Sequence, residues 1–148
     1  MRRIWAVLLI AVGVAVLAPL GHASAAVKPR RLVAIEWAFT QAGKPYIFGG
    51  TGPGGYDCSG LVMVAYRHAG ISLPRTSEQI EADSAQLVRI PRSQARWGDI
   101  AAYGPGHVEL YMGNDVVNWT FGAHESGTVI GRITFGGSWR PTAYYRPR

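Results

Sequence analysis

The only cysteine of the sequence, Cys58, directly follows the glycine-rich stretch GGTGPGGYD at residues 49–57. Asp57 is a typical helix N-cap, and residues 58–69 have helical spacing before Gly70. At a helix start, free backbone N–H groups and the helix dipole lower the pKa of a thiol and favour the nucleophilic thiolate. We therefore predict that Cys58 is a reactive nucleophile rather than a small buried hydrophobe.

A nucleophilic thiol needs a base that takes its proton and returns it to the leaving group, and histidine is the usual choice. His68 lies ten residues after Cys58 on the same predicted helix, about 15 Å along its axis, which is too far. We expect it to be a surface histidine. His107 opens the alternating run HVELYM behind a Gly-Pro-Gly turn, so a strand end could present its ring to the helix. A lone histidine at a strand end is more often structural or solvent-facing, so the spacing alone leaves His107 as a candidate base, with His124 as the other remaining histidine of the domain.

Helical patterns dominate the first half of the sequence, and short strand patterns dominate the second half. Apolar spacing predicts a helix over 31–42, which Gly43 and Pro45 end, and then a loop over 46–56. Thr76 and Gln79 have the spacing of a capping box at the start of a short helix. Strand patterns occupy residues 99–103, 107–112, 116–123, 129–135 and 142–146. This order predicts an α+β fold in which helices pack on an antiparallel sheet.

Residues 1–25 have the pattern of a secretory signal peptide, with two arginines, an apolar run from Ile4 to Leu17 and the triplet Ala23-Ser24-Ala25. The run is shorter than the roughly 20 residues of a membrane span. We predict cleavage after Ala25, export to the medium or cell wall without stable membrane insertion, and one domain over 26–148.

The chain carries a formal charge of +6, which becomes +4 without Arg2 and Arg3. A basic exported domain favours anionic surfaces such as the bacterial cell wall. Its basic residues are scattered rather than gathered in a stripe, which argues against nucleic acid as a partner. We expect a monomer.

The segments GKPYIFGGTGPGGYDCSGLV, AGISLPRTSEQ, WGDIAAY and GHVELYMGN resemble, in this order, the NlpC-type family of bacterial cell-wall cysteine peptidases. The resemblance implies a papain-like fold that needs neither metal nor organic cofactor. It implies Cys58 as nucleophile, His107 as general base and acid, and Tyr46 as an oxyanion donor together with the Cys58 backbone N–H. It also implies a group of substrate-binding residues: Asp57, Ser59, Arg75, Thr76 and Ser77.

The implied function is hydrolysis of peptidoglycan stem peptides, at the bond between D-Glu and the following diamino acid, through a thioester on Cys58. Two alternatives stay open. One keeps the fold but changes the reaction to a wall amidase or an acyltransferase. The other is a non-catalytic wall-binding module.

The family's third polar residue, which orients the catalytic histidine, usually follows it by about twelve positions. Here that position is Trp119, which cannot accept a hydrogen bond. Asn118 and His124 are the candidates. If Asn114-Asp115 forms a two-residue hairpin turn, Tyr111 pairs with Asn118 and His107 with Gly122. Of the two candidates, this register brings His124 closer to His107, so we favour it.

Glu109 lies on the same predicted strand face as His107, where relatives commonly have glycine. It could raise the pKa of His107, contact an amine of the substrate or face solvent. We expect it to be solvated.

Overall fold

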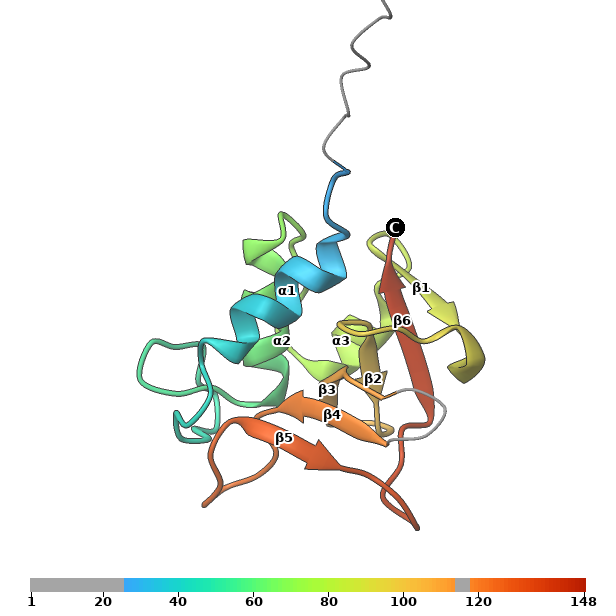
Figure 1. Ribbon diagram of the computed structural model, residues 1–148. Coiled ribbons are helices and arrows are strands. Elements are labelled where there is room, and N and C mark those ends of the chain that lie inside the picture. Colours follow the sequence, from blue (N-terminus) through green and yellow to red (C-terminus); the bar gives the residue numbers. More distant parts are fainter. Residues whose placement is uncertain (1–25, 114–117) are drawn as a thin grey trace, which may run out of the picture.

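The computed structural model describes residues 26–113 and 118–148, and the predicted signal peptide at 1–25 lies outside this range. Three α-helices precede all six strands of the sheet in the described residues: α1 (Arg30–Phe39), α2 (Cys58–His68) and α3 (Ser77–Ala82). In Figure 1 the helices lie together on one side and the strands curve around the other. Among the described residues, no helix combines the length and apolar character needed to cross a membrane.

Six strands form one antiparallel sheet in the order β1-β6-β2-β3-β4-β5. They are β1 (Leu87–Ile90), β2 (Ile100–Ala102), β3 (Val108–Tyr111), β4 (Trp119–Gly122), β5 (Gly131–Thr134) and β6 (Ala143–Pro147). The last five overlap the predicted strands, and the α+β prediction is confirmed. The edge strand β1, whose short sequence LVRI carries an arginine, was not predicted.

Helix α2 is the centre of the main core, because it packs against α1 and the sheet. Its residues from Cys58 to Tyr66 are all buried, which matches their nearly unbroken apolar sequence. Val108 and Leu110 of β3 belong to this core. By strand alternation, Glu109 and Tyr111 point to the other sheet face, where Tyr111 joins a second, smaller apolar cluster.

The register of the β3–β4 hairpin differs from the prediction. Tyr111 pairs with Thr120 rather than with Asn118, and the Met112 N–H donates to the Trp119 carbonyl. The pairing expected from a two-residue turn at Asn114-Asp115 is therefore wrong, while the turn residues themselves lie outside the described residues. The shift is two positions, so each side chain keeps its predicted face.

Candidate active site

Cys58 is the first residue of α2, where Asp57 caps the helix as predicted. One Asp57 carboxylate oxygen accepts from the Gly60 N–H at 2.7 Å, and the other accepts from the Gly49 N–H at 2.9 Å. The cap therefore ties the glycine-rich loop to the helix start. Cys58 itself is nearly buried, with 7% of its surface exposed.

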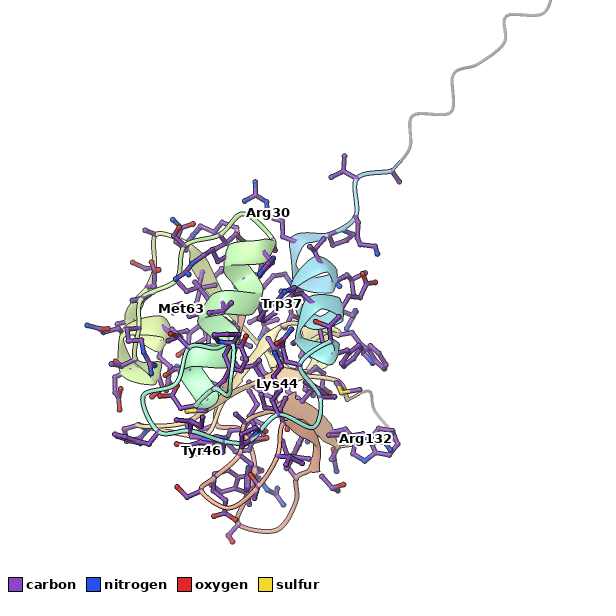
Figure 2. All side chains as sticks on the ribbon, turned by 90° about the vertical axis from the view of Figure 1, so that its left-hand side faces the viewer. Arg30, Trp37, Lys44, Tyr46, Met63 and Arg132 are labelled. Carbon is purple, nitrogen blue, oxygen red and sulfur yellow. The ribbon has the colours of Figure 1, made fainter. Side chains whose placement is uncertain are left out.

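The first turn of α2 requires glycine at position 60 because the loop backbone packs against it. A Cβ atom there would lie 2.1 Å from the carbonyl oxygen of Gly50, closer than packed atoms allow. The loop backbone thus lies directly on the first turn of α2. In Figure 2 this loop carries Tyr46 below the lower end of α2, where the helix begins.

His107 lies just before β3 and interacts with Cys58 through hydrogen bonding and charge. Burial alone would raise the pKa of Cys58, but the His107 interaction and the Val108 and Ser59 N–H groups outweigh it and lower the pKa. Burial alone would lower the pKa of His107, yet Cys58 and Glu109 raise it to about 9. Both shifts favour the thiolate form of Cys58 and the imidazolium form of His107, and the thiolate is the form that attacks carbonyl carbon.

Tyr46 lines the same groove as Cys58. Its pKa is raised, first by burial and then by the negative charges of Cys58 and Asp57. The hydroxyl therefore keeps its proton and can donate a hydrogen bond. A donor of this kind beside a nucleophile can stabilise an oxyanion.

Arg75 joins the residues that flank the nucleophile. Its guanidinium binds both oxygens of Asp57, at 3.0 and 2.5 Å, and also donates to the Ser59 hydroxyl at 2.9 Å. Burial would raise the pKa of Asp57, but Arg75 and the Gly60 and Gly49 N–H groups hold it below its usual value. The carboxylate therefore holds the loop, the helix start and Arg75 together.

A groove of about 480 Å³ runs beside Cys58. The predicted capping box of Thr76 and Gln79 is present and begins α3 at the wall of this groove. Phe48, of which 88% is exposed, also lines it. The structure thus brings to one groove all the predicted nucleophile, oxyanion and substrate-binding residues: Tyr46, Asp57, Cys58, Ser59, Arg75, Thr76 and Ser77.

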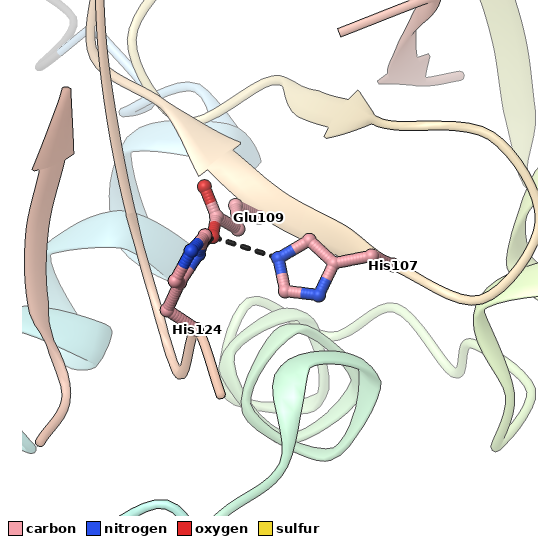
Figure 3. A group of neighbouring side chains, drawn as sticks. All are labelled: His107, Glu109 and His124. Carbon is pink, nitrogen blue, oxygen red and sulfur yellow. Dashed lines mark hydrogen bonds and ion pairs between the residues drawn. The ribbon is translucent and has the colours of Figure 1, made fainter. Parts of the chain in front are cut away.

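Glu109 lies between His107 and His124, as Figure 3 shows. One Glu109 oxygen is 2.7 Å from His107 Nε2 and 2.9 Å from His124 Nδ1. The expectation that Glu109 is solvated is wrong, because the residue is fully buried. His124 thus reaches His107 through this carboxylate rather than by a direct bond. Asn118 is bound to Arg92 at 2.6 Å instead.

Burial would raise the pKa of Glu109, but hydrogen bonds from the two histidines and the positive charge of His107 lower it to about 2.

His68, which was expected to be a surface histidine rather than the base, is exposed at the C-terminal end of α2. Its ring stacks on Trp37 with 4.4 Å between ring centroids.

Trp139 and Tyr103 also belong to this site, although the sequence pattern did not indicate them. Trp139 stacks on Tyr103 with 4.6 Å between ring centroids, and its ring lies 5.4 Å from His107 and 5.0 Å from His124. It comes from the connection between β5 and β6, more than 30 residues after His107. Only the fold brings it there, so no local signal could have identified it.

Comparison with known proteins places these features in one family. The sequence profile described as the NlpC/P60 family matches residues 43–142. A probable endopeptidase of Corynebacterium glutamicum is 39% identical over 102 residues, which are 68% of this chain and 47% of the relative. The chain spans less than half the length of the curated relatives it matches.

Solved structures agree with the sequence comparison. A hypothetical invasion protein of Mycobacterium tuberculosis superposes with a TM-score of 0.67 at 29% identity, over 79% of this chain and 61% of the other. RipD of the same organism, described as a non-catalytic NlpC/p60 domain protein adapted to peptidoglycan binding, gives 0.62 at 30% identity, over 80% and 97%. The papain-like fold expected from the sequence is confirmed.

Proposed function

The chain belongs to the NlpC/P60 family, and from this membership we propose that it is an exported cysteine endopeptidase of peptidoglycan stem peptides. The observation that carries the proposal is the position of the Cys58 thiol in an open groove, where its Sγ lies 3.8 Å from the carbonyl oxygen of Gly106, the residue before His107, and where His107 lowers its pKa. Export follows from the signal-peptide pattern of residues 1–25, which leaves residues 26–148 as the working domain.

The reaction begins with attack of the Cys58 thiolate on the carbonyl carbon of the scissile bond. The carbonyl π electrons move to oxygen, and this oxyanion is held by the Cys58 backbone N–H and the Tyr46 hydroxyl. The N–H is available because the first N–H groups of a helix have no partner within it. Each such donor is typically worth about 3 kcal/mol in the transition state.

His107 completes both halves of the reaction. As imidazolium, it gives its proton to the leaving amine when the tetrahedral intermediate collapses to a thioester on Cys58. As neutral imidazole, it then takes a proton from water, which attacks the thioester and releases the acid product and the Cys58 thiolate.

The charged wall of the groove suits a stem peptide, which carries free carboxylate, amide and amine groups. Ser59, Thr76 and Ser77 offer neutral polar contacts, while Arg75 and Asp57 offer opposite charges. We assign cleavage to the bond between D-Glu and the diamino acid. Because Asp57 already binds Arg75 through both oxygens, a substrate amine would have to share this carboxylate with Arg75.

Mass spectrometry of peptidoglycan digested by the wild type and by Cys58→Ala tests the proposal. We expect fragments cut within the stem from the wild type and none from Cys58→Ala, with both proteins folded by circular dichroism. Fragments cut at the lactyl amide would indicate an amidase instead. Binding without cleavage by both proteins would indicate a wall-binding module, the role described for RipD.

A further inference from the structure

Glu109 is a buried carboxylate with a donor at each of its acceptor positions. His107 and His124 contact one oxygen. The Tyr103 hydroxyl donates to the other oxygen at 3.0 Å, and the Thr120 hydroxyl donates to the same oxygen. An unpaired buried carboxylate is costly, whereas one with a full set of donors is held in a single orientation. Glu109 is therefore a rigid acceptor beside His107.

The opposite strand leaves the space that this side chain fills. A Cβ atom at Gly122 would lie 2.8 Å from the Cγ of Glu109, which is too close for packed carbon atoms. The absence of a side chain at Gly122 of β4 therefore leaves room for the Glu109 side chain, which extends from β3 across the β4 backbone.

The contact fixes which nitrogen of His107 carries a proton. An ionised carboxylate accepts but cannot donate, so Nε2 must be protonated when it bonds to Glu109. The other ring nitrogen, Nδ1, faces helix α2 in Figure 3 and is left to exchange a proton with Cys58. From this geometry we propose that Glu109 is the positioning residue of the reaction, holding His107 in the Nε2-protonated form, with His124 holding Glu109.

This inference rests on the proposed role of His107 as general base and acid. It differs from the direct histidine–histidine contact expected from the sequence, because the acceptor comes from the same strand as His107. Trp139 completes the arrangement by packing against both histidine rings. The Glu109 carboxylate is fully buried, and a buried charge acts more strongly on its neighbours than one in water, which strengthens its electrostatic effect on His107.

The three side chains His107, Glu109 and His124 also have the composition of a metal site, since their ligand atoms lie within 4.8 Å of one another. The separations of 2.7 and 2.9 Å between donor and acceptor are hydrogen-bond lengths. The second oxygen of Glu109 is also held by two hydroxyls. These contacts favour a role in which Glu109 hydrogen-bonds the two histidines over a role in which the three residues bind a metal ion.

Glu109→Gln tests the proposal, because it keeps the shape and removes the charge. Alkylation by iodoacetamide reports on Cys58 alone, as the chain has one cysteine. We expect the alkylation midpoint to move to higher pH and the rate at neutral pH to fall about tenfold or more, since one pKa unit is a tenfold change in thiolate. With peptidoglycan fragments, kcat should fall by roughly 10²- to 10⁴-fold with little change in KM.

Asp99→Asn is the matched control, because Asp99 is also a fully buried carboxylate but binds Arg146. It should lower the melting temperature and leave the alkylation profile unchanged. A folded Glu109→Gln protein with wild-type alkylation and kcat would overturn the proposal. So would activity that is lost on chelation and restored by zinc.

If Glu109→Gln does not fold, the wild type still decides the question. Long-range ¹H–¹⁵N NMR of its imidazoles, recorded above pH 9 where His107 is neutral, should show the single ring proton of His107 on Nε2. A proton on Nδ1 instead would refute the inference. Neither alkylation nor NMR needs a substrate. A shifted alkylation profile without stem-peptide cleavage would therefore uphold Glu109 and reject the proposed function.

Discussion

His107 is protonated well above the usual range of histidine, since Cys58 and Glu109 raise its pKa from 6.5 to about 9 against the opposing effect of burial. The leaving amine needs this proton. We expect kcat/KM to fall as the pH rises through about 9, and to fall in acid as Cys58 becomes protonated. A pH–rate profile checks this, with tryptophan fluorescence as a control for unfolding. An upper limb near 6.5 would contradict it.

The same shifts affect stability. Because the pKa of His107 is raised on folding, its contribution is complete below about 6.5 and is lost as the pH rises through about 9. The pKa of Glu109 is lowered, so its contribution is complete above about 4.5 and is lost as the pH falls through about 2. The contributions of His107 and Glu109 are therefore both complete only between about pH 4.5 and pH 6.5.

Local sequence patterns correctly placed Asp57 and Cys58 at a helix start and His107 next to a strand, because a helix cap and a strand end are local features. The roles of these residues in catalysis came from the family resemblance. The local patterns failed for Glu109. An isolated acid in a strand is normally solvated, and burying it is favourable only when several donors surround it. Those donors come from His124, Tyr103 and Thr120, which only the folded sheet brings together.

At the scale of elements, the loop over 46–56 and the first turn of α2 form one packed unit. We expect Gly60→Ala to destabilise the fold by about 1–3 kcal/mol, because its Cβ would overlap the Gly50 carbonyl oxygen. It should also slow catalysis, since Tyr46 lies on the displaced loop. Urea unfolding and kcat measurements test both effects.

Gly54→Ala is the control, because a Cβ there meets nothing within 4 Å and its φ is not positive. It should leave stability within about 0.5 kcal/mol of the wild type. An equal loss of stability in Gly60→Ala and Gly54→Ala would show that the loop requires the flexibility of glycine rather than close packing.

The helices and the order of the later strands were predictable because each has its own period and its own end signals. The β3–β4 register was not. Asn-Asp is a good turn signal, but the length of a connection depends on which strand residues pair, and here pairing ends at Met112 and Trp119. The two-residue shift carried His124, rather than Gly122, to the level of His107.

At the scale of the whole molecule, Asp99 connects the first helix to the last strand. Fully buried, it binds Arg146 of β6 at 2.6 Å and lies 3.9 Å from Arg31 of α1. We expect Asp99→Ala to lower the free energy of unfolding by roughly 3 kcal/mol, because it takes away the carboxylate that the partly buried guanidinium groups of Arg146 and Arg31 share. Chemical denaturation monitored by circular dichroism measures this.

Glu36→Ala provides the comparison, since Glu36 pairs with Lys28 at a surface where both side chains are about half exposed. Its loss should cost no more than about 1 kcal/mol. A similar cost for the two variants would mean that Asp99 does not join the helical and sheet halves of the domain.

Gly122 finally has a consequence for how such a site could arise. Positions 109 and 122 compete for one volume, so a bulky residue at 122 excludes the glutamate, and the overlap at 2.8 Å involves the inner part of its side chain. Alanine at position 122 would therefore displace Glu109 from its place between the two histidines, so the residue on β4 limits which side chain position 109 of β3 can hold.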